Sequence, residues 1–142
     1  MIDNTDLAEC ADCLCLASRR AALAITRSFE RALRPHGIRV TQFSALTALL
    51  LHGPMTIGAL ADFLGLDRTT LTRNLNLIED RRWIGVHTGE DARLRVVEVT
   101  ATGRRKIESV LPAWRSAQAT AAKTLGTSGA AALRDVAARA VF

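Results

Sequence analysis

Residues 56–99 have the sequence TIGALADFLGLDRTTLTRNLNLIEDRRWIGVHTGEDARLRVVEV, and this stretch decides the fold. Its first part, residues 56–64, carries apolar residues at helical spacing and is followed by a tight turn at Gly65. Asp67 is expected to cap a second helix that extends to about residue 82. The inward face of this second helix is formed by Leu71, Leu75 and Ile78. Two short helices joined by such a turn are typical of a helix-turn-helix.

A predicted β-hairpin follows the second helix directly. Residues 83–87 and 96–99 have the composition of short strands, and the polar residues 88–95 between them form the tip. A hairpin in this position is a wing. The stretch therefore predicts a winged helix-turn-helix, a fold that is mainly helical with a small β wing.

On the N-terminal side of this unit, two helices are predicted. Residues 7–33 form one long amphipathic helix, which is stopped by Pro35 and Gly37. A second helix is expected to start at Thr41, as its N-cap, and to end at Leu51.

On the C-terminal side, Thr100 is expected to cap a helix over residues 101–125, which Pro112 would kink or break. A last helix is expected over residues 130–140. The caps expected for this last helix are Thr127 or Ser128.

The exit of the wing carries the most specific motif, which consists of Asp91, Arg93, Val97, Val99, Thr100 and Gly103. Upstream of it, Val40-Thr41-Gln42-Phe43 is followed by Leu46, and residues 60–73 form the helix-turn-helix. In these positions the chain resembles the MarR family of transcriptional regulators, over about residues 7–140.

This resemblance implies a homodimer that binds double-stranded operator DNA. It implies an N-terminal dimerisation helix in residues 1–40, a winged helix-turn-helix in residues 41–100 and C-terminal dimerisation helices in residues 101–142. It also implies that a small ligand or oxidation relieves DNA binding. The two-fold symmetry predicts a pseudo-palindromic operator with half-sites about one DNA turn apart, and repression by occupying a promoter is the expected outcome.

The charge balance agrees with an anionic partner. The chain has 19 Lys and Arg against 14 Asp and Glu, a net charge of +5 and a pI near 10.1. Lys106 and Lys123 are its two lysines, and the other basic residues are Arg, whose planar fork suits phosphates and base edges. Coding bias is the alternative reason for this arginine content.

Polar side chains occupy the outward face of the second helix of the motif. Arg73 is suited to a guanine and Asn76 to an adenine, and Arg68 near the helix N-terminus is suited to phosphates or first-turn bases. The DNA-contacting candidates of this helix are Arg68, Thr69, Thr70, Thr72, Arg73 and Asn76. The alternative for each residue is a merely solvated helix face.

The wing tip adds Arg93 and Arg95, which alternation along a strand puts on one side. By resemblance, Arg93 enters the minor groove and Asp91 holds Arg93 or the hairpin in shape. The alternative is a weak surface ion pair. Residues 15–40 contain six further arginines, which either lie on a solvated helix face or contact the DNA backbone or the partner subunit. They are Arg19, Arg20, Arg27, Arg31, Arg34 and Arg39.

Three cysteines, Cys10, Cys13 and Cys15, form a cluster near the N-terminus. On one continuous helix, Cys10 and Cys13 could share a ligand, whereas Cys13 and Cys15 lie on opposite flanks. Three readings stay open for these redox or effector candidates: packing as small hydrophobes, redox sensing, and binding of a metal or metalloid. The histidines, His36, His52 and His87, have no ligand spacing with them, and no metal or other cofactor is required by the sequence.

The redox reading rests on a second resemblance. The organic-hydroperoxide sensors of the family (OhrR-like) have a reactive Cys shortly before a Ser-Arg pair, and Cys13 and Cys15 precede Ser18-Arg19 here. That subgroup activates its thiol with tyrosines, and this chain has none. Arg19 or Arg20 would have to substitute electrostatically.

The alternative effector is a small aromatic or lipophilic molecule. The aromatic residues Phe29, Phe43, Phe63, Trp83 and Trp114 are candidates for its site, although aromatic residues more often form core.

Other function classes find no support. The sequence has no triad-like, P-loop, HExxH or dinucleotide-binding motif, so an enzyme is not expected. It has no apolar run long enough to span a membrane and no signal peptide, so a cytoplasmic location is expected.

Overall fold

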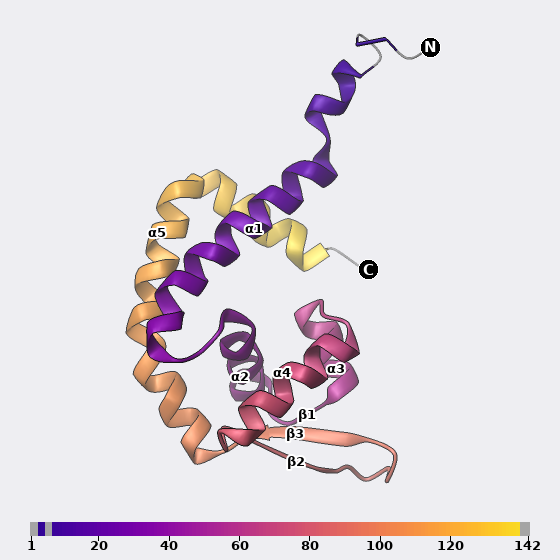
Figure 1. Ribbon diagram of the computed structural model, residues 1–142, viewed down its shortest axis with the longest axis vertical. Helices are drawn as coiled ribbons and strands as arrows, with labels where there is room; N and C mark the ends of the chain where they lie inside the picture. Colours follow the sequence, from indigo (N-terminus) through magenta and orange to yellow (C-terminus); the bar gives the residue numbers. More distant parts are fainter. Residues whose placement is uncertain (1–2, 5–6, 140–142) are drawn as a thin grey trace.

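The computed structural model describes residues 3–4 and 7–139 and is mainly helical with a small antiparallel sheet (Figure 1). Its elements are η1 (Ala8–Asp12), α1 (Leu14–Leu33), η2 (Arg34–His36), α2 (Val40–His52), β1 (Met55–Thr56), α3 (Ile57–Leu64), α4 (Arg68–Asp80), β2 (Ile84–Thr88), β3 (Arg95–Val99) and α5 (Ala101–Arg139). Helices α2, α3 and α4 and the sheet gather at one end, and α1 and α5 extend away from them. None of the helices in the described part is long and apolar enough to cross a membrane.

The sheet confirms the predicted wing and adds a strand to it. β3 lies in the centre, with β2 and β1 antiparallel on its two sides. The short β1 pairs Met55 with Val97 and Thr56 with Val96. Thr56 also caps α3, because its Oγ1 accepts the backbone N–H of Ala59 at 3.2 Å. β1 therefore ties the start of the helix-turn-helix to the wing.

One hydrophobic core unites the helix-turn-helix, the wing and the first half of α5. Fully buried residues come from each of these elements, from the end of α1, from the α1–α2 connection and from α2, and they include Leu33, Ile38, Leu46, Leu60, Leu71, Ile78, Val97 and Val110. Leu71, Leu75 and Ile78 of α4 all point inward as predicted. The small Ala61 of α3 is buried in the same core, which allows α3 and α4 to approach closely.

The prediction of one continuous helix over residues 7–33 is wrong in its first part. Cys13 has an extended backbone, with φ −61° and ψ 113°, and separates η1 from α1. All described side chains between Leu7 and Cys13 are exposed, so no buried contact holds these residues in a helix, and a short unpacked helix is marginal. The angular placement of the three cysteines on one helix therefore does not hold.

The N-cap of α2 also differs from the prediction: it is Arg39 rather than Thr41. The Oε1 atom of Gln42 accepts the backbone N–H of Arg39 at 3.0 Å. The Oε1 atom of Glu30, from α1, accepts the backbone N–H of Val40 at 3.1 Å. A carboxylate from the preceding helix thus does part of the capping, which no local sequence rule would reveal.

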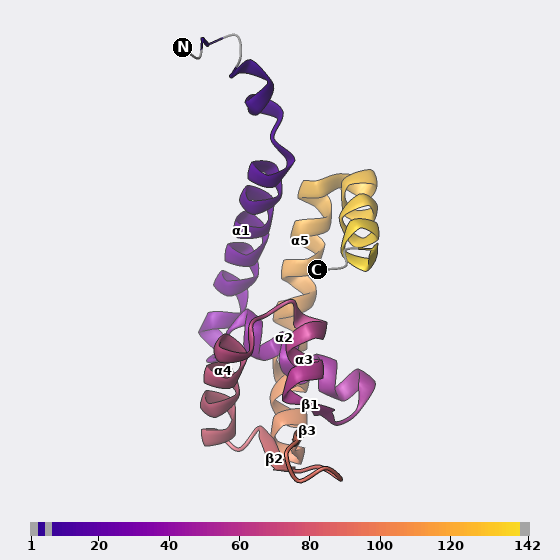
Figure 2. The ribbon, with the colours of Figure 1, turned by 90° about the vertical axis from the view of Figure 1, so that its right-hand side faces the viewer.

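α5 bends at Gly126 and not at Pro112. Gly126 has φ 71° and ψ 168° and is the residue with non-helical angles inside α5, whereas the chain stays helical through Pro112. After Gly126 the chain turns back (Figure 2), and Figure 1 shows that the last part of α5 runs at an angle to the first segment and diverges from it. The expected break near residue 125 is therefore present, and the end of the last helix at Ala140 lies outside the described residues.

Candidate nucleic-acid interface

A tight turn presents α4 to solvent. Gly65 has the left-handed φ of 63°, and the backbone N–H of Leu66 donates to the carbonyl of Ala61 at 3.0 Å. Asp67 then caps α4 with both carboxylate oxygens: Oδ1 accepts the backbone N–H of Thr70 at 2.8 Å, and Oδ2 accepts its hydroxyl at 2.6 Å. The hydroxyl bond, followed by the backbone bond, lowers the pKa of Asp67.

The outward face of α4 carries the predicted side chains on one shallow surface. It is lined by Arg68, Thr69, Thr72, Arg73 and Asn76, all of them exposed. Thr70 is exposed as well, but its hydroxyl is bonded to Asp67, so it belongs to the cap. The face is therefore rich in donors and acceptors of the kind that match base edges and phosphates.

The wing tip is held by Asp91. Its Oδ1 accepts the backbone N–H of Arg93 at 3.0 Å and lies 3.5 Å from Nε of the same residue. The backbone N–H of Leu94 donates to the carbonyl of Asp91, and that of Gly89 donates to the carbonyl of Leu94, both at 2.8 Å. The Arg93 side chain is 91% exposed, so its guanidinium extends into solvent from a bonded turn.

The wing and α4 border a common cleft. This cleft has a volume of about 230 Å³, and Arg68 and Thr72 of α4 line it together with Arg93 and Arg95 of the wing. The hairpin of β2 and β3 projects from the same end of the molecule as α3 and α4 (Figure 1). The structure thus brings Arg68, Arg93 and Arg95 together, as parts of one surface.

At the base of the wing lies a cluster that sequence reasoning missed. The indole of Trp83 is buried, with the Arg81 guanidinium 5.2 Å and the Lys106 ammonium 5.1 Å from its ring centroid. Arg81 also donates to the carbonyl of Gly37 at 3.3 Å, and Lys106 donates to the carbonyl of His36. Arg81 therefore ties the α1–α2 connection to the end of α4, and Lys106 ties it to α5, through contacts between residues more than 40 positions apart.

The cysteine cluster lies far from the surface formed by α4 and the wing, in the exposed N-terminal segment. Cys10, Cys13 and Cys15 are all free thiols and are exposed in the single chain. The backbone N–H of Cys13 donates to the carbonyl of Cys10 at 3.3 Å, so the two residues close a turn. Within the described ranges, no group of three His, Cys, Asp or Glu side chains is arranged to hold a metal ion.

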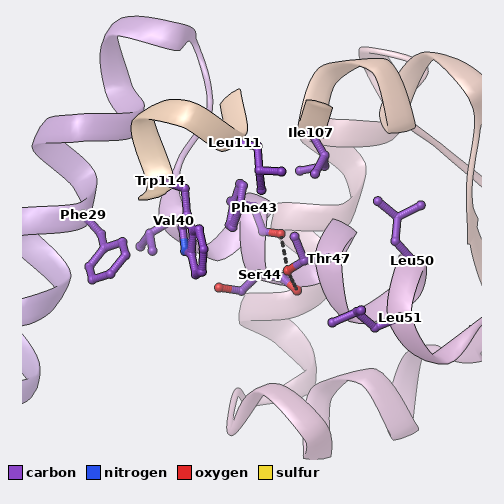
Figure 3. A pocket seen from close by; sticks show the side chains of 10 residues that line it. All are labelled: Phe29, Val40, Phe43, Ser44, Thr47, Leu50, Leu51, Ile107, Leu111 and Trp114. Carbon is purple, nitrogen blue, oxygen red and sulfur yellow. Dashed lines mark hydrogen bonds between the residues drawn. The ribbon is translucent and has the colours of Figure 1, made fainter. Parts of the chain in front are cut away.

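An apolar pocket of about 560 Å³ lies between α1, α2 and α5 (Figure 3). Phe29, Phe43 and Trp114 line it, and the rings of Phe43 and Trp114 stack at 6.0 Å and 17°. Of the five aromatic candidates, Phe63 and Trp83 do not line this pocket. Phe63 instead lies against His52 at 5.0 Å, and Trp83 lies under its two cations.

Comparisons with known proteins agree with this geometry. Residues 36–94 match the MarR family model. An uncharacterized HTH-type transcriptional regulator of Bacillus subtilis, YwoH, is 30% identical over 91 residues, which are 64% of this chain and 66% of that protein.

Two solved structures illustrate the likeness. The Mycobacterium tuberculosis transcriptional regulator MosR in complex with DNA is 39% identical, with a TM-score of 0.78 and coverage of 89% of this chain and 92% of that one. A mutant of Escherichia coli MarR complexed with operator DNA is 21% identical, with a TM-score of 0.80 over 94% and 97% of the two chains. The family consists of regulators rather than enzymes. This chain belongs to the MarR family of DNA-binding winged helix-turn-helix transcriptional regulators.

Proposed function

We propose that the protein is a homodimeric repressor that binds a pseudo-palindromic operator through α4 and the wing. The observation that carries this proposal is the continuous exposed surface formed by the outward face of α4 and the wing arginines. α4 enters the major groove, where Arg73 donates to a guanine and Asn76 pairs with an adenine. Thr69 and Thr72 flank these two contacts.

The wing enters the adjacent minor groove. Arg93 and Arg95 extend from the tip, and narrow A·T-rich minor grooves attract arginine electrostatically. Asp91 is bonded to the backbone of Arg93, so it shapes the tip and does not contact DNA, whose phosphates repel a carboxylate.

Dimerisation uses α1 and α5. Large apolar side chains are exposed on these arms outside the winged domain, among them Leu14 at 84% exposure, Leu16, Leu23, Leu133 and Val136. Apolar groups gathered in this way mark an interaction surface, and a second copy of the chain covers it. The two-fold axis then sets the half-sites about 34–36 Å apart.

The test is fluorescence anisotropy with a duplex from the region upstream of the gene. Arg73→Ala removes a bidentate base contact and is expected to weaken operator binding about 10- to 100-fold. Arg93→Ala is expected to weaken it as well. Arg115→Ala, an exposed arginine on α5 remote from the surface, is the matched control and leaves the affinity unchanged. Equal affinities for all four proteins would refute the proposed surface.

A second part of the proposal is that oxidation of the cysteines releases the protein from DNA. Cys10 and Cys13 close a four-residue turn, whose Cα atoms lie less than about 7 Å apart, and disulfides need roughly 4.4–6.8 Å. A hydroperoxide oxidises the two thiols to a disulfide and is itself reduced to an alcohol and water. The new crosslink changes the segment that precedes α1, at the dimer arm.

Parallel titrations of reduced and peroxide-treated protein test this step. Loss of operator affinity on oxidation, and its recovery with a thiol reductant, are the expected results. The protein with Cys10, Cys13 and Cys15 all changed to Ser is expected to bind DNA with or without peroxide. If that variant responded to peroxide as the wild type does, the cysteines would not be the sensor.

A second candidate signal is a small aromatic or lipophilic molecule, and the pocket between α1, α2 and α5 favours it. Its walls are mostly apolar, and the polar groups of its lining side chains are the hydroxyls of Ser44 and Thr47 and the indole N–H of Trp114. The dye 8-anilinonaphthalene-1-sulfonate, whose aromatic rings fluoresce in apolar surroundings, is a suitable probe. Its fluorescence is expected to rise with the wild type and not with Ser44→Trp, which fills the pocket. An unchanged signal in that variant would place the dye elsewhere.

A further inference from the structure

The cleft between α4 and the wing has the composition of an anion site. Three arginines, Arg68, Arg93 and Arg95, line its volume of about 230 Å³, together with the hydroxyl-bearing Thr56 and Thr72. No Asp or Glu side chain is among the residues that line it. Asp91 contacts Arg93 through Nε and the backbone N–H, and within the described residues the terminal nitrogens of that guanidinium make no hydrogen bond.

Gly58 leaves space for the tip of the Arg68 side chain, which a side chain at position 58 would displace. A Cβ atom on Gly58 would lie 2.6 Å from Nη2 of Arg68 and 3.4 Å from its Cζ. The guanidinium therefore lies directly on the backbone of the first turn of α3, in space that any other residue would fill. Gly58 has no left-handed φ, so its missing side chain, and not its backbone freedom, is what the site uses.

The geometry of DNA explains why such a cleft is needed. If α4 occupies a major groove and the wing the neighbouring minor groove, the sugar–phosphate strand that separates these grooves has to pass between the two elements. Each phosphate on that strand carries one negative charge. In that arrangement the cleft faces this strand, and Arg68 is the arginine of its lining that does not enter the minor groove.

We propose that this cleft seats one backbone phosphate of the strand between the two grooves, and that Gly58 is a positioning residue that lets Arg68 reach it. This inference rests on the proposed function, since it assumes that α4 and the wing bind neighbouring grooves. Arg68 is then a contact that is independent of base sequence, in contrast to Arg73.

Two duplexes, the operator and a scrambled sequence, separate these roles. Arg68→Ala is expected to weaken binding to both by about the same factor, near 10-fold, and to make the slope of log K against log salt shallower by about 1 for each half-site. Arg73→Ala is expected to reduce the ratio of the two affinities instead. Arg68→Lys keeps the charge and loses the planar guanidinium that donates two parallel hydrogen bonds. Its affinity for DNA is therefore expected to lie between those of the wild type and Arg68→Ala.

Gly58→Ala tests the positioning role. It is expected to reproduce the shallower salt slope of Arg68→Ala, and to add little when combined with Arg68→Ala, because both changes remove the same contact. Gly129→Ala, on α5, is the matched control and leaves the slope unchanged.

A duplex with one neutral methylphosphonate linkage, moved along the strand, locates the phosphate. One position per half-site is expected to weaken wild-type binding and to have no effect on Arg68→Ala. Unchanged salt slopes in the Arg68 and Gly58 variants, with Arg73→Ala still impaired, would overturn the phosphate site and leave the proposed function intact. Failure of the wild type to prefer the operator would overturn both.

Discussion

Gly103 lies directly against the backbone of Trp83: a Cβ atom on Gly103 would stand 2.0 Å from the Trp83 carbonyl oxygen and 2.8 Å from Cγ1 of Val99. Thr100 joins the same junction. Its Oγ1 donates to the Arg82 carbonyl at 2.6 Å and accepts the backbone N–H of Gly103 at 3.0 Å. The Thr-x-x-Gly motif is therefore the place where α5 packs onto the start of the wing, and only glycine fits there.

Gly103→Ala is expected to destabilise the protein by at least about 2 kcal/mol, because the methyl group overlaps main-chain atoms that cannot move away. Urea denaturation measures this effect. Gly129→Ala is the control in the same helix, since its Cβ would meet Leu125 at an ordinary 3.6 Å. That variant is expected to gain up to about 1 kcal/mol from helix propensity. Equal stabilities for the two variants would contradict the packing account.

Arg82 is a residue with left-handed backbone, φ 58°, at the end of α4. The backbone N–H of Arg82 donates to the Glu79 carbonyl at 2.7 Å and that of Trp83 to the Ile78 carbonyl at 3.0 Å, which is the pattern of a Schellman cap. Arg82→Gly is expected to stabilise the fold by up to about 1 kcal/mol, and the β-branched Arg82→Val to destabilise it. Thermal unfolding ranks the melting temperatures of the wild type and the two Arg82 variants. A more stable Val variant would refute this assignment.

Asp67 makes the stability of α4 dependent on pH. Because its folded pKa lies below the ordinary value, the cap stabilises the protein above the unfolded pKa, near 3.8, and this contribution is lost as the pH falls through the folded pKa. Asp67→Asn keeps a capping oxygen without the charge. The difference in melting temperature between wild type and Asp67→Asn is expected to shrink between pH 6 and pH 3. A constant difference over that range would show that the charge is not involved.

Asp91 influences DNA binding in two opposed ways, and two variants separate them. Asp91→Ala removes the acceptor for the Arg93 backbone N–H and is expected to weaken operator binding about 3- to 10-fold, as expected for the loss of one hydrogen bond. Asp91→Asn keeps an acceptor oxygen and removes a charge that repels phosphate, so its affinity is expected to equal or exceed that of wild type. Anisotropy titrations at one salt concentration suffice. Equal losses in both variants would mean that the charge is what matters.

The parts of the fold set by local patterns could be predicted from the sequence. The Gly65 turn, the Asp67 cap and the inward row of α4 each follow from neighbouring residues, and the structure has all three. The exposed polar face of α4 follows from the same helical period. The two strands of the wing could be predicted from the sequence, whereas the two-residue β1 is too short to show an alternation of apolar and polar residues.

Features that depend on distant contacts could not be predicted in this way. The break at Cys13 reflects missing tertiary packing, and the capping of α2 by Glu30 joins two helices. The cations around Trp83 come from α4 and α5 and reach the carbonyls of the α1–α2 connection. Pro112 shows the converse: a local helix breaker is accommodated, and the bend falls at Gly126. The effect of Gly58 on Arg68 likewise requires the packing of α3 against α4.

The most direct test of the central claim, sequence-specific DNA binding by α4 and the wing, is the affinity of the reduced protein for two duplexes. One comes from the region upstream of its own gene and the other is a shuffled sequence of the same composition, each measured at three salt concentrations. The account predicts a preference of about 10³-fold or more for the upstream duplex, two chains per duplex, and a steep loss of affinity with salt. Equal affinity for both duplexes at every salt concentration would contradict it.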